Sequence, residues 1–291
     1  MSRSVSPSEP AEDAGPPAQP VLESARTCAR DRYLSALLAP ADAQGDLVVL
    51  AAYLGEVGRV PLLAQDATIG EIRLQWWRDA LAAPGPSGHP VADAVRDVRD
   101  RRRIDDALLM APIEGVSREL YEDGVADQRA LDLYAEETDG AAIRLALAVL
   151  GGGDRDAEAD RLAGLGGRAL AVTRLALALP QHLAHGRLPL PAAFLGAQRD
   201  PRGACPAEAR AATRVLLARL AGEAEQALAA VRSREGRIDR GLFPAFLPLC
   251  LVQPYFKVMM TPKRDVLEDV ADLSPLSRVT RLWLAHWRGR I

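Results

Sequence analysis

The segment Ala169–Leu195, ALAVTRLALALPQHLAHGRLPLPAAFL, joins a long apolar run to a short basic loop. Only Thr173 and Arg174 interrupt the apolar run, which predicts a buried helix. We expect Pro180 to end or kink this helix, because proline removes a backbone hydrogen bond. No Asp or Glu occurs from position 161 to position 199. A mechanism that needs a metal-binding carboxylate here therefore has none to use.

The composition of the 291 residues predicts an all-α fold. Ala, Leu and Arg are abundant, and clusters of Val, Ile and Thr with strand-like alternation are nearly absent. The net charge of -3 is small, so no whole-molecule field draws the chain to nucleic acid. The charged run at 96–106, RDVRDRRRIDD, mixes both signs and reads as a solvated helix face near a helix break rather than a nucleic-acid patch.

The ends and the cysteines suggest a cytoplasmic chain. Residues 1–20 are rich in Ser, Pro, Ala and Glu without an apolar core, so we expect a disordered tail before one domain at 21–291. The three cysteines are far apart and form no zinc or disulfide pattern. The apolar run at 242–252 is too short to span a bilayer, while the stretch 242–260 is either a membrane-surface segment or a buried hairpin.

Helix boundaries can be predicted from caps and breakers. We expect a first helix at 21–38, and a second that begins after Asp46 as N-cap and is closed by Pro61. Thr68 and Glu71 form a capping box for a third helix, which leads to a loop at 84–90. Further helices are expected at 112–123, 127–150 and 206–232, and the final third alternates short apolar helices with proline breaks.

Four segments, in this order, resemble the squalene/phytoene synthase family, and the resemblance covers roughly residues 30–258. They are Arg32–Tyr33 with LVVLAAYLGEVGRV, then IRLQWWRDAL from Ile72, YAEETDGAAIRLALAVLG from Tyr134, and the Gly-Arg-x-x-Leu-Pro-like HGRLPLPAAFL that contains Arg187. The resemblance implies an isoprenoid-synthase-type helical bundle around a central cavity.

The chain departs from the family pattern at both metal motifs. In the family enzymes, two aspartate clusters hold Mg²⁺ ions that bind the substrate diphosphate. Aligned with that pattern, this chain has Gly58, Arg59 and Leu62 at the first cluster, and Ala178 and His182 at the second. None is a carboxylate, so the resemblance implies no metal site and no cofactor. Mg²⁺ would be needed only if the chain were an enzyme.

Within the family, the chain is most similar to the branch of a mitochondrial complex I assembly factor, which also lacks the metal aspartates. Shared features are an aromatic-x-x-Glu at Tyr53–Glu56, an Ile-Gly and aromatic-Trp pattern at Ile69–Trp77, Tyr-Ala-Glu at Tyr134–Glu136, and Pro-x-His at Pro180–His182. This resemblance implies a non-catalytic protein that assembles or stabilises a respiratory complex. It also implies a protein partner at the inner membrane, a position peripheral to that membrane, and a cavity that takes an isoprenoid lipid or diphosphate.

The candidate cavity and ligand residues combine aromatic, basic and a few polar side chains: Tyr53, Glu56, Arg59, Trp77, Arg78, Tyr134, Arg174, His182 and Arg187. We interpret His182 and His185 as a loop pair at the cavity mouth, with a two-ligand metal site as the alternative. Five arginines either line the cavity or form helix ion pairs: Arg73, Arg78, Arg144, Arg174 and Arg187. Trp76 and Trp77 cannot share one helix face, so one should be core and the other exposed or in contact with a neighbouring helix.

Two further hypotheses remain open. The chain could be a prenyl diphosphate transferase, a head-to-head coupling enzyme of the phytoene or squalene type, whose Mg²⁺ is held by other acids, such as Glu56, Glu71, Asp79, Glu136, Glu137 or Asp139. It could also carry an isoprenoid or quinone-like lipid without turnover.

Overall fold

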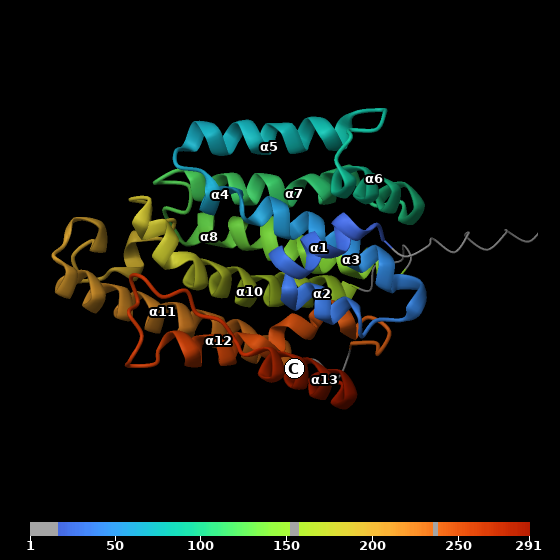
Figure 1. Ribbon diagram of the computed structural model, residues 1–291. Coiled ribbons are helices and arrows are strands. Elements are labelled where there is room, and N and C mark those ends of the chain that lie inside the picture. The colour runs from blue at the N-terminus through green and yellow to red at the C-terminus, as the bar shows by residue number, and fades with distance from the viewer. Residues whose placement is uncertain (1–16, 152–156, 235–237) are drawn as a thin grey trace, which may run out of the picture.

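The computed structural model describes residues 17–151, 157–234 and 238–291, and these form a stack of helices (Figure 1). No strand occurs within these three ranges, so the predicted all-α class is confirmed. Helix α10 lies in the middle of the stack, α5 at one edge and α13 at the opposite edge (Figure 1). Most of the predicted tail at 1–20 lies outside the described residues, but its last two residues are already helical.

The predicted first helix is two helices, α1 (Gln19–Cys28) and α2 (Arg30–Ala36). Pro20 sits in the first turn of α1, where its missing N–H removes no helix hydrogen bond. The break at Ala29 has extended φ, and the following helix α3 (Ala41–Gly58) approaches it closely at Gly55. A Cβ at Gly55 would lie 2.7 Å from the Cβ of Cys28. The break therefore turns the start of α2 toward the centre of the molecule.

The predicted N-cap of the second helix is wrong, because α3 begins five residues before Asp46. Asp46 is buried in α3 and accepts hydrogen bonds from Arg101 and Arg102, each at 2.5 Å. Pro61 does not close the segment either, since it begins the short helix α4 (Val60–Leu63), where a proline is tolerated. The sequence pattern identified the helix but not the ion pairs of Asp46, which join α3 to α6.

Next come α5 (Ala67–Ala82), α6 (Pro90–Arg102) and α7 (Asp106–Ser117). The predicted bounds 112–123 are wrong for α7, which begins six residues before Pro112 and ends at Ser117. The N-cap of α5 is Asp66, which accepts from Ile69 N at 2.9 Å, so the predicted Thr68–Glu71 capping box is wrong. Glu71 instead accepts a hydrogen bond from Ser117. The predicted helix break inside the charged run lies at Arg103, in the left-handed conformation.

A π-helical turn interrupts the next helical segment. The turn η1 (Arg118–Leu120) leads to α8 (Gln128–Ala135), the π-turn η2 (Glu136–Gly140) and α9 (Ala141–Gly151). Such turns are common at functional sites. The backbone of η2 touches α10, because a Cβ added to Gly167 would fall on the backbone of Gly140. Two glycines therefore allow the π-turn and the central helix to meet.

Helix α10 (Ala157–Ala184) contains Pro180 and continues for four residues beyond it. The expectation that Pro180 ends the helix is therefore wrong. This helix is long and apolar enough to cross a membrane, but 67% of its most apolar window is buried inside the bundle. It packs against α8, η2, α9, α11 and α12, as a core helix does.

The last third wraps around α10. It comprises the turns η3 (Ala192–Phe194) and η4 (Pro201–Gly203), α11 (Pro206–Arg232), the 3₁₀ segment η6 (Phe243–Leu251), α12 (Val252–Met259) and α13 (Pro275–Arg288). Phe246, Leu247 and Leu249 are fully buried, so the buried alternative holds for the apolar part of the stretch 242–260, while Lys257 and Met260 near its end are exposed.

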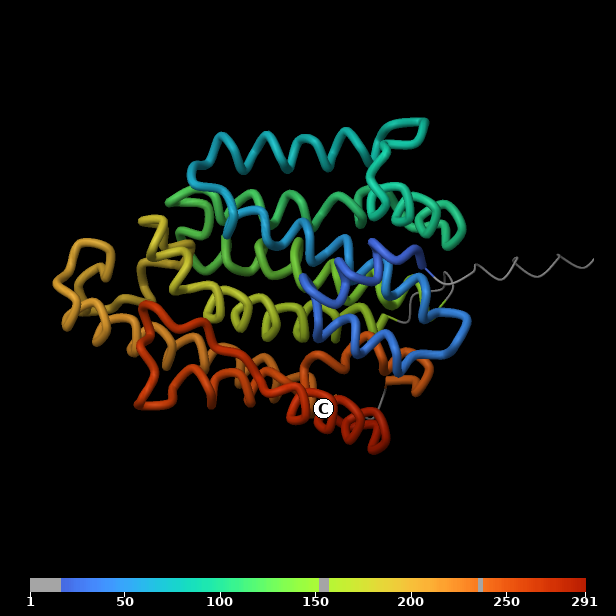
Figure 2. Tube along the Cα trace, viewed as in Figure 1, coloured from blue at the N-terminus to red at the C-terminus, as the bar shows by residue number. Residues whose placement is uncertain are grey.

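Two apolar clusters form the core, one in each half of the chain. Leu34, Ala146 and Leu150 pack against both, so the clusters are continuous. The Cα trace in Figure 2 shows that the first helices lie against the last third of the chain, where α2 contacts η6 and α13. Residues from both ends of the sequence thus meet around one hollow.

Candidate functional site

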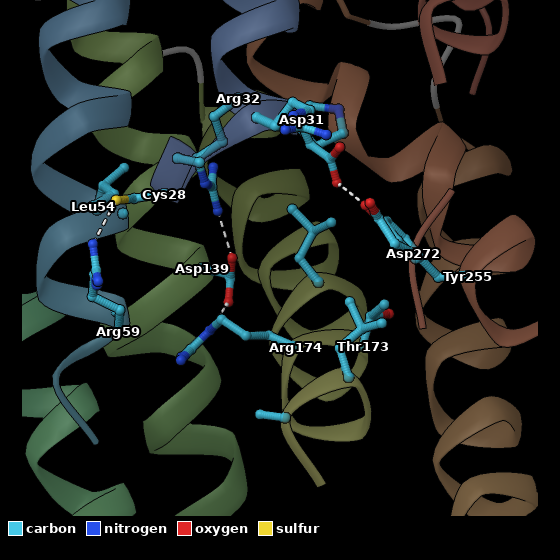
Figure 3. Close-up of a pocket in the computed structure, with 18 of the residues that line it drawn as sticks. Cys28, Asp31, Arg32, Leu54, Arg59, Asp139, Thr173, Arg174, Tyr255 and Asp272 are labelled. Atoms are coloured by element: carbon cyan, nitrogen blue, oxygen red, sulfur yellow. Dashed lines mark hydrogen bonds and ion pairs between the residues drawn. The ribbon is translucent and has the colours of Figure 1, made fainter. Parts of the chain in front are cut away.

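A cavity of about 480 Å³ lies where the break between α1 and α2, the C-terminal end of α3, the π-turn η2, α10 and the C-terminal segments meet (Figure 3). Its wall is mixed. Apolar residues include Leu54, Leu170, Leu177 and Val252, and five arginines and three aspartates supply the charge. The arginines are Arg30, Arg32, Arg59, Arg174 and Arg278, and the aspartates are Asp31, Asp139 and Asp272. Because the arginines outnumber the aspartates by two, the wall is electropositive.

Asp139 is held between two arginines. It accepts a hydrogen bond from Arg32 of α2 and another, at 3.2 Å, from Nε of Arg174 on α10 (Figure 3). The π-turn η2 brings Asp139 to the wall between these helices. Because both of its oxygens are used, this carboxylate joins two cations instead of offering a free ligand face.

A second ionic group closes the opposite wall. The Arg278 guanidinium of α13 is 2.5 Å from Asp31 and also contacts Asp272. Tyr255 donates to Asp31 at 2.7 Å and accepts from Arg278 at 3.0 Å. Burial raises the pKa of the Asp31 carboxyl, although Tyr255 and Arg278 oppose this effect. Both other wall aspartates are thus paired with one buried arginine.

The residues at the family's metal positions do not fit a magnesium ion. Gly58, Arg59, Leu62 and Ala178 all line the cavity, as the alignment of motifs predicts. Arg59 lies at the first position, and its guanidinium donates to Sγ of Cys28 at 3.2 Å. Among the residues that the structure describes, no three His, Cys, Asp or Glu side chains are grouped closely enough to hold a metal ion. Magnesium needs several oxygen ligands, and the side chains at these four positions supply none.

His182 does not line the cavity, so its predicted position at the cavity mouth is wrong. It lies inside α10, is fully buried, and its Nε2 is 3.1 Å from Glu119 Oε2. His185 bonds the carbonyl of Gln181 at 2.7 Å, so the two histidines do not form a metal pair. Helix α10 runs past Pro180, and this rotates His182 into the core.

Glu119 is the centre of a buried network directly behind the cavity wall. It accepts from Arg174 at 2.5 Å and from the Tyr134 hydroxyl at 2.9 Å, in addition to its contact with His182. Arg174 also lies over the Tyr134 ring, 5.1 Å from its centroid. Burial alone would raise the pKa of the Glu119 carboxyl, but Arg174 and His182 outweigh it and lower this pKa to about 2. Glu119 therefore stays charged and fixes Arg174 in the wall.

Arg187 holds the loop after α10 rather than a ligand. It is buried and donates to the carbonyl oxygens of Pro61 at 2.6 Å and Ala64 at 3.1 Å. It is absent from the cavity wall. Through Arg187, the loop that follows α10 is thus joined to α4, the short helix that follows Arg59.

The remaining predicted residues lie in the core or on the surface. The Tyr53 hydroxyl donates to Leu109 O at 2.6 Å, and its ring packs edge-on against Trp77. Trp77 is buried and Trp76 is 41% exposed, as predicted for adjacent tryptophans. Arg78 pairs with Glu114, so the helix ion-pair alternative holds for this residue. Glu56 accepts from Ser24 at 2.6 Å.

Of the nine candidates, Arg59 and Arg174 line the cavity, and Tyr134 and His182 lie in the network behind it. The wall residues Asp31, Asp272 and Arg278 were missed, and so was Glu119 of the network behind the wall. Asp139 was named only as a ligand for the enzyme hypothesis. The run Arg30–Tyr33 was a usable signal, because it places three charged residues next to one another in a segment that the family resemblance assigns to the first metal region. Glu119 has no local signal, since its partners are 15, 55 and 63 residues away.

Solved structures of related fold include a dehydrosqualene synthase in complex with ligand, with a TM-score of 0.71 at 15% identity over 93% of this chain and 98% of that chain. Squalene synthase HpnC from Alicyclobacillus acidocaldarius has a TM-score of 0.58 at 19% identity over 93% of this chain and 94% of that one. At these identities, the likeness supports the fold alone.

Relatives with higher identity are named NADH dehydrogenase (ubiquinone) complex I, assembly factor 6. The protein from Rattus norvegicus is 28% identical and that from Homo sapiens is 25% identical, each over 92% of this chain and 81% of the relative. A family model for squalene/phytoene synthase matches residues 25–283. This match spans almost the whole described chain, and it confirms the predicted family: the chain belongs to the squalene/phytoene synthase family.

Proposed function

We propose that this chain is a non-catalytic squalene/phytoene synthase-like protein that acts in the assembly or stabilisation of respiratory complex I. Its relatives in four mammals carry the name of a complex I assembly factor and align over 92% of the chain. The observation that carries the proposal is the cavity wall, where Gly58, Arg59, Leu62 and Ala178 stand at the family's metal positions.

Loss of the metal site removes the chemistry of the family enzymes. An allylic diphosphate ionises only when the charge on the leaving pyrophosphate is neutralised, and a magnesium cluster provides this neutralisation. Arginines can bind a diphosphate, but they do not replace a metal cluster that also orients it. The cavity is therefore suited to binding and poorly suited to bond cleavage.

The prenyl transferase hypothesis needs acids near the cavity, and the structure leaves most of them elsewhere. Of its six candidate ligands, only Asp139 lines the cavity, and it is occupied by Arg32 and Arg174. The other five pair with groups outside the cavity, as Glu136 does with Arg144 and Glu137 with Arg118. We therefore propose no resident cofactor for this chain.

The electropositive wall favours a second role, which is compatible with the first. A hollow of about 480 Å³ with leucines and five arginines suits an isoprenoid lipid or diphosphate that is bound but not converted. Nη2 of Arg174 is buried without a hydrogen-bond partner among the described residues, so it is one donor available to an anion. A bound lipid would also explain why the cavity has not been filled by larger side chains.

The proposed setting is the cytoplasmic side of the inner membrane, with a protein partner there. The test is a deletion strain of the host, in which complex I is followed by native gel electrophoresis and by NADH oxidation in isolated membranes. We expect less assembled complex I, and rescue by the wild-type gene. Normal complex I in the deletion strain would contradict the assembly role.

The enzymatic alternative is tested separately with purified protein. Farnesyl or geranylgeranyl diphosphate and Mg²⁺ are added, and pyrophosphate release is measured beside an active family enzyme. We expect no release. Turnover together with normal complex I in the deletion strain would establish the transferase in place of the assembly factor.

A further inference from the structure

The outer face of α13 exposes a row of apolar side chains. Leu276, Val279, Trp283 and Trp287 are between 48% and 75% exposed. They are spaced three or four residues apart, so they share one face of the helix. The rings of Trp283 and Trp287 are stacked, with centroids 6.2 Å apart. Two adjacent exposed tryptophans on one helix face are more than the scattered apolar residues normal for a protein surface.

This row plays no part in the protein core. The opposite face of α13 carries Arg278, Leu282 and Ala285, which are buried against the bundle. Arg278 closes the cavity by pairing with Asp31 and Asp272. The helix is therefore already anchored by one face, and the tryptophan face is directed outward.

A basic hollow of about 660 Å³ adjoins the same helix. None of the wall residues that the structure describes is Asp or Glu. Five wall residues are cationic: Arg232, Lys257, Arg281, Arg288 and Arg290. Arg232 is held by Gln253 and the backbone oxygen of Ile291. In the described parts of the chain, Lys257, Arg288 and Arg290 have no ion-pair partner. These three cations are available to an external anion.

The sequence strengthens this charge asymmetry. From Pro275 to Ile291 there are four arginines and one histidine but no acid, although the whole chain has a net charge of -3. The exposed apolar residues of α5, such as Ile72 and Trp76, differ in this respect. They lie among Glu71, Asp79 and two arginines, so both charge signs are present around them. At α13, by contrast, the exposed apolar row and the basic hollow lie on the same helix.

We propose that α13 docks the protein on the surface of a membrane that contains anionic phospholipids. Trp283 and Trp287 enter the interfacial layer, where tryptophan is favoured because its ring is apolar and its N–H can stay hydrated. The basic hollow receives the phosphates of lipid headgroups. A soluble protein partner would need a surface both apolar and acidic, whereas an anionic bilayer offers both features together. The inference does not depend on the role in complex I assembly.

The test is co-sedimentation of the full chain with vesicles of phosphatidylcholine, or of phosphatidylcholine and phosphatidylglycerol in equal amounts. We expect binding to the mixed vesicles, weak binding to the neutral ones, and loss of binding at high salt. The double substitution W283S/W287S should weaken binding more than about tenfold because it removes the inserting rings. The charge reversal K257E/R288E should weaken it about tenfold or more, and should also reduce the salt dependence.

Matched controls lie on α5, at the opposite edge of the stack (Figure 1). I72S removes an apolar side chain that is 65% exposed, and R73E reverses a surface charge, and neither should change vesicle binding. Circular dichroism and thermal unfolding should be unchanged in all four variants, because every substituted side chain is largely solvent-accessible. The proposal is overturned if the wild type fails to bind mixed vesicles, or if I72S and W283S/W287S lose binding equally. A dimer in solution that W283S/W287S converts to a monomer would also overturn it, by assigning the face to a second copy.

Discussion

The two positions that hold metal ions in the family enzymes differ in their surroundings in this chain. At the first, Arg59 is exposed at the end of α3, and its guanidinium makes one weak contact with Cys28. At the second, His182 is fully buried and pairs with Glu119, which also binds Arg174 and Tyr134. One side of the hollow is thus open, whereas a buried network supports the wall on the other side. From this difference we expect Glu119 and its partners to contribute to stability, and Arg59 to be available to a ligand.

The largest expected effect is at Glu119, the centre of the closed side. Glu119→Gln removes the charge of a fully buried carboxylate and leaves Arg174, whose side chain is 28% exposed, with only Asp139 as a charged partner. We therefore expect a loss at the lower end of the buried ion-pair range, about 3 kcal/mol of the free energy of unfolding. Urea unfolding followed by circular dichroism measures this loss. The matched control is Glu114→Gln, whose half-exposed pair with Arg78 should be worth under about 1 kcal/mol. Equal losses of unfolding free energy for the two substitutions would contradict the view that the network around Glu119 stabilises the fold more than a surface ion pair does.

The same carboxylate should make stability depend on acid pH. The pKa of Glu119 is lowered from 4.5 to about 2 in the folded state, so its contribution is complete above pH 4.5 and is lost as the pH falls toward 2. The shift corresponds to about 3 kcal/mol. Unfolding free energies measured over this pH range should fall more steeply for the wild type than for Glu119→Gln. The other carboxylates are common to both proteins, so the difference between the two slopes isolates Glu119.

A substitution at Tyr134 shows whether a hydrogen bond to the charged Glu119 contributes more to stability than one to a neutral group. Tyr134→Phe removes a buried hydrogen bond to the Glu119 carboxylate, and we expect a loss of about 2 kcal/mol in the free energy of unfolding. Tyr53→Phe removes a buried hydrogen bond to the neutral carbonyl of Leu109 and should cost only about 1 kcal/mol. Thermal unfolding of the two variants side by side gives the comparison. A larger loss for Tyr53→Phe would show that burial matters here more than charge.

The same contrast explains what could be predicted from sequence. Apolar periodicity was sufficient for the all-α class, for the buried central helix and for the tryptophan pair, because these features depend on residues close in the chain. Family motifs led to Arg59, Ala178 and Gly58 in the cavity wall, because aligned positions keep their place in a common fold. The partners of Asp46, Glu119 and Asp31 could not be predicted, since each is set by the packing of helices far apart in sequence. Of the two outcomes expected at Pro180, an end or a kink, the helix end is wrong, since α10 continues to Ala184 and stays packed in the bundle.

The smallest effect on stability is expected at Arg59, on the open side. Arg59→Ala removes an exposed side chain with one weak contact, so the free energy of unfolding should change by less than about 0.5 kcal/mol. If the cavity binds a prenyl diphosphate through its arginines, the same change should weaken that binding by about tenfold, since charge-assisted hydrogen bonds are each worth about 1.5–3 kcal/mol. Isothermal titration with farnesyl diphosphate, with and without Mg²⁺, measures both points. Binding that is independent of Mg²⁺ and sensitive to Arg59 would identify an arginine site, whereas binding that requires Mg²⁺ would mean that acids reach the ligand after all.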